Sequence, residues 1–135
     1  MATRHQVRQS VISLLYAFEL NSQNNVFVDE ILDEKKIRNE QKNFTLNLYN
    51  GILDNLNNID ETLNSFLNDN QITALGHVER AILRLGAYEL LFTDTPSAIV
   101  INEAIELAKE LANDNSPKFI NGVLDALIKV FLKIC

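Results

Sequence analysis

The chain has few of the residues that build linkers, disulfides or membrane spans. Its 135 residues include four glycines, two prolines and one cysteine, which is Cys135 at the end. So few glycines and prolines leave no room for a flexible linker or a low-complexity tail. A single cysteine excludes an internal disulfide and a cysteine-based metal site, as is usual for a cytoplasmic protein. No apolar run reaches the length of a membrane span, and the N-terminus lacks a signal-peptide pattern. We therefore expect one cytoplasmic domain.

Positive charge is also scarce, and it is unevenly placed. The formal net charge is −6, yet no acidic residue precedes Glu19, whereas Arg4, His5 and Arg8 lie near the start. A protein that coats nucleic acid by general electrostatics needs many lysine and arginine contacts to phosphates. The charge therefore excludes that mode, and any RNA binding must be confined to a local site.

The apolar residues follow helical spacing throughout, with no convincing strand. Helical patterns cover about 3–20, 28–32, 40–56, 59–67, 75–92, 101–112 and 120–131. The pattern over 75–92 is the most apolar, so it should lie at the centre of a bundle, with Arg80 and Arg84 facing water. Gly86 within it indicates close approach of another helix. These patterns predict an all-α bundle.

The sequence shows no catalytic or metal-binding pattern. His5 and His77 have no partner at metal-binding helical spacing, and no glycine-rich loop follows a strand. Glu103 and its acidic neighbours on the same helix are typical of a solvated face. Glu89 lies near an apolar stripe, which favours a buried carboxylate that holds an arginine. We expect no enzyme, no cofactor and no metal.

The first candidate for anion binding is the start of the first helix. Arg4, Arg8, Ile12 and Tyr16 fall at i+4 spacing, in a row beside the core face that we expect to be partly exposed. Two arginines in a first helical turn oppose the helix dipole and repel each other, at a cost of a few tenths of a kcal/mol each. A bound phosphate would turn both effects into gains. The alternative is two solvated arginines without a ligand.

The second candidate is the junction between the last two helical patterns. Asn113, Asp114 and Asn115 break the first pattern. Ser116 can cap the next helix through its hydroxyl, and Pro117 suits a first turn.

Lys118 and Phe119 then fall in that first turn, with Phe119 displaced from the apolar stripe. A helix N-terminus with a lysine suits a phosphate, and a nearby ring suits a stacked base. Alternatively, Phe119 packs over Gly122 and Ala126, which the local pattern favours.

Two unbroken runs at this junction, Ile101 to Lys109 and Lys118 to Asp125, carry a family resemblance. They resemble the C-terminal part of the NusB family of bacterial antitermination factors. The resemblance covers nearly the whole chain, as a single NusB-like domain over 1–135. It implies two small helical bundles packed across each other, an N-terminal one of about 1–70 and a C-terminal one of about 75–135.

The resemblance also implies a function. NusB proteins bind the boxA element of nascent ribosomal-RNA leaders together with NusE, a small-subunit ribosomal protein, and join RNA polymerase with other Nus factors. Carried over by position, the RNA-binding residues are Arg4, His5, Arg8, Lys118 and Phe119, which makes base stacking the preferred role of Phe119. The residues carried over to the NusE surface are Tyr16, Leu20 and Glu79.

The chain departs from the family at two places, and rival interpretations remain open. Its arginine-rich run is thin, with His5 and Gln6 where some relatives have arginine, and Thr73 and Ala74 lack the acidic character seen in others. One rival is a stand-alone relative of the RNA-binding domain of ribosomal-RNA cytosine methyltransferases. Another is a protein-only helical adaptor or homodimer, in which the proposed site is only surface and core.

Overall fold

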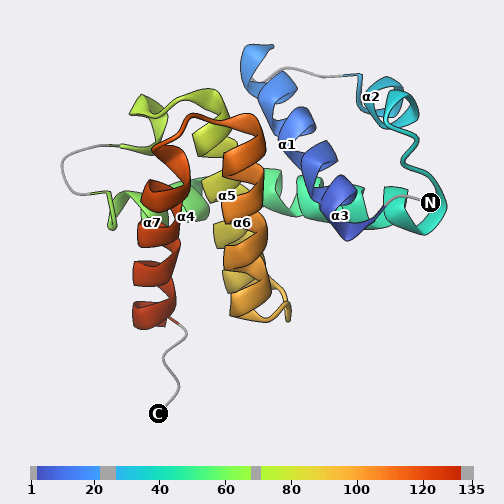
Figure 1. The fold of residues 1–135 in the computed structure, drawn as a ribbon. Coiled ribbons are helices and arrows are strands. Elements are labelled where there is room, and N and C mark those ends of the chain that lie inside the picture. The colour runs from blue at the N-terminus through green and yellow to red at the C-terminus, as the bar shows by residue number, and fades with distance from the viewer. Residues whose placement is uncertain (1–2, 22–26, 68–70, 132–135) are drawn as a thin grey trace. The chain divides into compact units, whose positions relative to one another are not determined.

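The computed structural model describes residues 3–21, 27–67 and 71–131, and within them every regular element is a helix (Figure 1). The all-α prediction is confirmed. Cys135 and most of the predicted breaks at 21–25 and 68–71 lie outside the described residues. None of the described helices is long and apolar enough to cross a membrane. Contacts divide the chain into two compact units, the first ending at Asp54 and the second beginning at Asn55.

The first unit holds α1 (Arg4–Leu20), α2 (Val28–Glu34) and α3 (Asn39–Asp54), and α1 packs against both of the others. The predicted cap at Thr3 is confirmed, because its hydroxyl accepts a hydrogen bond from the Gln6 backbone N–H at 3.1 Å. Gln6 Oε1 accepts one in return from the Thr3 N–H at 2.8 Å, which completes a capping box. Burial raises the pKa of the Tyr49 phenol in α3. The buried apolar residues of this unit are Val7, Val11, Ile12, Leu14, Leu15, Leu32, Ile37, Leu48, Tyr49 and Ile52.

The turn from α2 to α3 is tight because Lys36 adopts a left-handed backbone, with φ of 58°. The Ile37 N–H donates to the Leu32 carbonyl at 2.9 Å, and the Lys36 N–H donates to the Asp33 carbonyl at 3.0 Å. This pair of bonds is a Schellman motif, which satisfies the last carbonyls of α2. Ile37, 2% exposed, is thereby turned into the core.

The second unit holds α4 (Leu56–Asn64), a 3₁₀ turn η1 (Ile72–Ala74), α5 (His77–Phe92), α6 (Ser97–Leu111) and α7 (Ser116–Phe131). The central position predicted for α5 is confirmed, since it contacts α4, α6 and α7. The helix break expected at 57–58 lies instead at Asn55, before α4. Because α4 packs on α5, the division by contacts precedes α4 and differs from the expected division near 70.

The close approach predicted at Gly86 is confirmed. A Cβ built on Gly86 would lie 2.8 Å from Leu124 Cδ1, so α5 and α7 meet where only hydrogen fits. Further along α7, Phe131 meets Phe66 edge to face, with ring centroids 6.2 Å apart. These two contacts place α7 directly on the rest of its unit.

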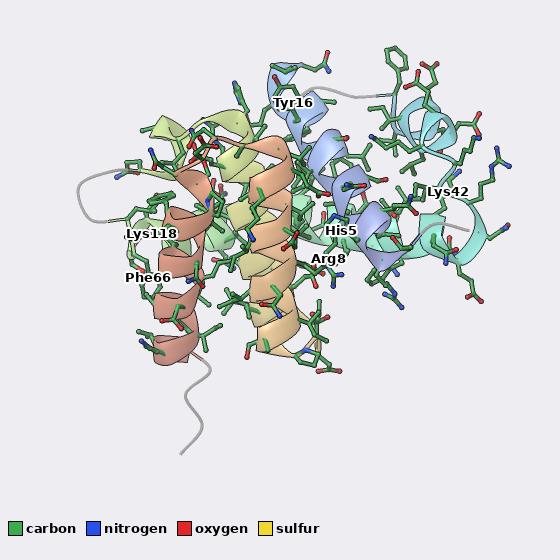
Figure 2. The ribbon with its side chains drawn as sticks, viewed as in Figure 1. His5, Arg8, Tyr16, Lys42, Phe66 and Lys118 are labelled. Carbon is green, nitrogen blue, oxygen red and sulfur yellow. The ribbon has the colours of Figure 1, made fainter. Side chains whose placement is uncertain are left out.

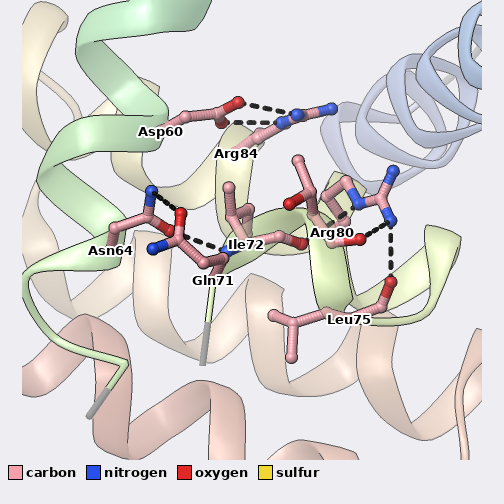
Figure 3. A network of polar contacts seen from close by, with 8 residues as sticks. Asp60, Asn64, Gln71, Ile72, Leu75, Arg80 and Arg84 are labelled. Carbon is pink, nitrogen blue, oxygen red and sulfur yellow. Dashed lines mark hydrogen bonds and ion pairs between the residues drawn. The ribbon is translucent and has the colours of Figure 1, made fainter. Parts of the chain in front are cut away.

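The prediction that Arg80 and Arg84 face water is wrong. Arg84 is 3% exposed and binds both carboxylate oxygens of Asp60 from α4, at 2.9 and 2.8 Å (Figure 3). Arg80 is 8% exposed and donates to the carbonyls of Ile72, Thr73 and Leu75, at 3.2, 2.8 and 2.8 Å. The two guanidinium groups therefore tie α4 and η1 to the central helix. Their burial is tolerated because each is paired or hydrogen-bonded.

Candidate nucleic-acid interface

The first candidate site, at the start of α1, contains one exposed arginine in a fixed position. Arg4 is exposed, and its guanidinium carbon lies 3.8 Å from the ring centroid of Phe44 in α3. The arginine and ring therefore form a cation–π pair. The Thr3 capping box holds the backbone just before Arg4, and the Phe44 ring contacts the guanidinium at the other end of the side chain. The arrangement presents a guanidinium plane that can meet a phosphate or a base.

Arg8 does not match its predicted exposure. It is 5% exposed and engaged in contacts within the protein. Ile12, the next member of the row, is 3% exposed, whereas Tyr16 at the end is 39% exposed. The row is therefore covered in its middle and open at its two ends. His5, which lies on the same helix (Figure 2), is half-buried and also has an interaction within the protein.

The second candidate site is the start of α7, where the role expected of Ser116 is corrected. Ser116 is the first residue of the helix and 1% exposed, and its hydroxyl donates to Glu79 Oε2 at 2.7 Å. Asn113 Oδ1 accepts from the Asn115 N–H at 3.1 Å, which closes an Asx turn just before the helix. The Ser116 hydroxyl is thus turned away from its own helix and towards α5.

The backbone donors of this first turn are mostly occupied. Ser116 N–H donates to the Asn113 carbonyl at 3.1 Å, and Phe119 N–H donates to the Asn115 carbonyl at 3.3 Å. Pro117 has no N–H. Among the residues that the structure describes, no acceptor pairs with the Lys118 N–H. A phosphate at this helix start would therefore find the Lys118 N–H and the exposed Lys118 ammonium.

Phe119 lies beside this lysine with part of its ring open. Its side chain is 37% exposed, whereas Ile120, the next residue, is fully buried. A Cβ built on Gly122 would meet nothing within 4 Å, so the ring does not cover that glycine. The alternative in which Phe119 packs over Gly122 therefore finds no support in the geometry. An open ring next to a cation is suited to stacking a base.

The sequence as a whole matches the model of the NusB family over residues 5–129. The chain belongs to the NusB family. It is 99% identical over 129 residues to the transcription antitermination protein NusB of Campylobacter jejuni subsp. jejuni serotype O:23/36, covering 96% of this chain and 98% of that protein. It is 63% identical over 129 residues to that of Campylobacter lari, with the same two coverages of 96% and 98%.

Solved NusB structures share the fold. The T. maritima NusB structure is 34% identical with a TM-score of 0.84, covering 96% of this chain and 93% of that one. A chain from the crystal structure of antitermination factors NusB and NusE in complex with double-stranded RNA is 30% identical with a TM-score of 0.86, covering 95% and 97%. At these identities the likeness extends beyond the fold to the family.

The residues carried over from the NusB family are divided between the two units. Arg4, His5 and Arg8 lie on α1 in the first unit, and Lys118 and Phe119 lie together on α7 in the second. Tyr16 and Leu20, at i+4 spacing on α1, are 39% and 58% exposed. Glu79 is half-buried in the first turn of α5.

Two contacts at the candidate sites were not predicted from the sequence. Phe44 supports Arg4, but an aromatic residue on a helix is ordinarily assigned to the core. Its position four residues before Leu48, on the apolar side of α3, was the available signal. Ser116 was seen only as a cap, and nothing in the sequence indicated Glu79, 37 residues earlier, as its acceptor. The described residues contain no group of three side chains able to hold a metal ion.

Proposed function

We propose that this member of the NusB family acts in transcription antitermination by binding a single-stranded boxA element of nascent ribosomal-RNA leaders together with NusE. The pair then joins RNA polymerase with other Nus factors. The observation that carries the RNA proposal is the exposed pair of Lys118 and Phe119 on the first turn of α7. Family membership supports the rest of the assignment.

The first turn of α7 offers the two contacts that single-stranded RNA uses most. Lys118 supplies a full positive charge and an unpaired N–H at a helix start, which together favour a phosphate. Phe119 supplies a ring face for a base, and such stacking contributes about 1–3 kcal/mol per base. A phosphate and its neighbouring base are adjacent in RNA, as these two residues are on the helix. The pair therefore fits one nucleotide.

The start of α1 adds a second, smaller contribution. Arg4 is the exposed cation there, held against Phe44, and we assign it to phosphate contact. Arg8 is buried and engaged in contacts within the protein, so its part in RNA binding is to support this end of α1. His5 stays in the proposed set as a half-buried neighbour of Arg4.

NusE is the protein partner that we assign to Tyr16, Leu20 and Glu79. The exposed Tyr16 and Leu20 form an apolar strip on one face of α1, which suits a protein contact. A related NusB has been crystallised with NusE and double-stranded RNA, which supports both kinds of partner. The RNA in that complex is double-stranded, so a test on this chain must compare both forms.

The deciding experiment compares two alanine substitutions on the same helix. Phe119→Ala should lower affinity for a single-stranded boxA RNA about tenfold or more, because a stacked base loses its platform. Phe131→Ala is the matched control, since Phe131 is 53% exposed on α7 but lies at its other end. It should leave RNA affinity unchanged. Binding is measured by fluorescence anisotropy with boxA, scrambled and double-stranded RNAs, with and without NusE.

The same variants separate this proposal from its rivals. If Phe119 were a core residue, Phe119→Ala would lower the free energy of unfolding by about 3 kcal/mol or more. Urea denaturation measures that directly. If the wild type binds none of the RNAs, with or without NusE, the proposed function fails and a protein-only adaptor is left. Arg4→Ala and Lys118→Ala are used for the charge contacts in place of Arg8→Ala, whose effect would include lost packing.

A further inference from the structure

The carboxylate of Glu79 is tied to the first residue of α7. Glu79 Oε2 accepts the hydrogen bond of the Ser116 hydroxyl at 2.7 Å, and Ser116 is 1% exposed. Lys118 and Phe119 follow Ser116 in the same turn. An acidic side chain from α5 therefore lies at the helix start to which the RNA contact is assigned.

Ser116 has a second acceptor available. Its hydroxyl oxygen also lies 3.0 Å from Asn113 Oδ1, and a hydroxyl has a single proton to donate. The shorter, charge-assisted bond to Glu79 is the stronger of the two. If Glu79 turned to another donor, Ser116 would keep a hydrogen bond through Asn113. Glu79 can therefore exchange partners without leaving a buried hydroxyl unsatisfied.

The charge of Glu79 acts on the same helix end that a phosphate would use. A carboxylate near a helix N-terminus stabilises the helix through the dipole. The same negative charge repels an RNA phosphate near Lys118. Glu79 and the RNA thus compete electrostatically for the start of α7.

We infer that Glu79 restrains RNA binding at α7, and that a hydrogen-bond donor or cation on the protein partner relieves this restraint by binding the Glu79 carboxylate. This inference rests on the proposed function, in which Glu79 contacts NusE. It makes the binding of NusE and of RNA mutually reinforcing, since a coupling between two ligands is reciprocal.

Glu79→Gln tests the charge alone. Glutamine keeps an oxygen that accepts the Ser116 hydrogen bond, so the link to α7 is preserved. The variant without NusE should bind single-stranded boxA RNA about two- to fivefold more tightly than the wild type, because one repulsive charge is removed. At saturating NusE the two proteins should bind this RNA equally, because the partner already neutralises Glu79 in the wild type.

Two further neutralising variants serve as controls. Asp94→Asn removes an exposed charge just beyond the C-terminal end of α5, about 24 Å along the helix from its start. That separation is well beyond the screening length of about 8 Å at physiological salt, so RNA affinity should not change. Asp114→Asn removes an exposed charge beside α7 that has no assigned partner contact. Its gain in RNA affinity should persist at saturating NusE.

The outcomes distinguish this inference from the proposed function. If neither the wild type nor any variant binds RNA, the proposed function and this inference both fail. When the wild type binds RNA, an unchanged or weaker affinity of Glu79→Gln overturns the inference alone. The inference is also overturned if the higher RNA affinity of Glu79→Gln persists at saturating NusE, as we expect for Asp114→Asn. Circular dichroism at each step confirms that the variants remain helical.

Discussion

At the scale of single residues, Lys36 occupies a backbone conformation that favours glycine. Its φ of 58° places a Cβ in the strained left-handed region, at the position after the C-cap of α2 where glycine is the common choice. Lys36→Gly should therefore raise the free energy of unfolding by about 0.5–1 kcal/mol. Urea denaturation monitored by circular dichroism measures the change.

Lys35→Gly is the matched control for this prediction. Lys35 has φ of −86°, which any residue adopts, so glycine there gains nothing and adds freedom to the unfolded chain. Its free energy of unfolding should stay the same or fall slightly. An equal loss in both variants would show that the left-handed geometry of Lys36 is not strained.

The same scale shows where sequence reasoning succeeds and fails at the candidate site. Gly86 was predicted correctly, because a glycine inside an apolar helix has few reasons other than close packing. Arg84 was predicted to face water and Arg8 to be partly exposed, because periodicity tells which side of a helix is apolar. It does not tell whether a residue at the edge of that side is covered. For Arg84 the answer depends on Asp60, 24 residues earlier, which no local pattern connects to it.

At the scale of helices, the contact between α5 and α7 gives opposite predictions for two glycines. Gly122→Ala on the open side of α7 should raise the free energy of unfolding by about 1 kcal/mol, because alanine favours the helix and meets nothing within 4 Å. Gly86→Ala should lower the free energy of unfolding by about 1 kcal/mol. The added Cβ would lie 2.8 Å from Leu124, and the cost of this clash exceeds the gain from the higher helix propensity of alanine.

Thermal and urea denaturation of the two variants check the sign of each change. A higher free energy of unfolding in Gly86→Ala would show that Leu124 moves aside, and that α5 and α7 are not held at their closest distance. Combining Gly86→Ala with Leu124→Val removes part of the clash. The double variant should therefore lose less free energy of unfolding than the two single variants lose together.

Helix positions were more predictable than helix ends, for a physical reason. The cap at Thr3 was correct because a capping box is made by residues three apart, all visible in the local sequence. The end of α3 was placed too late, because Asn55, Asn57 and Asn58 are equivalent break signals on their own. Packing of α4 on α5 selects Asn55. Ser116 was misjudged in the same way, since its acceptor lies on another helix.

At the scale of the whole molecule, charge and family membership constrain the function in different ways. The net charge of −6 argues against broad contact with nucleic acid, and it could not by itself reveal a local site. The two runs around the α6–α7 junction revealed the family, which the match over residues 5–129 confirms. Which side chains are exposed there, and what holds them, came only from the fold. An acidic protein with a small basic site should discriminate against most RNA.

That combination predicts a weak dependence of RNA binding on salt. Each phosphate contact on a single strand contributes a slope of about −0.7 to a plot of log affinity against log salt. Arg4 and Lys118 are the exposed cations among the residues assigned to RNA contact, so the slope without NusE should be about −1.4. Lys118→Ala should reduce it by about 0.7, whereas Lys109→Ala, on an exposed lysine of α6 paired with Glu106, should leave it unchanged. Anisotropy titrations between about 50 and 200 mM salt measure these slopes. A slope of about −4 or steeper would mean that RNA contacts many more cations than this site provides, and would contradict a local interface.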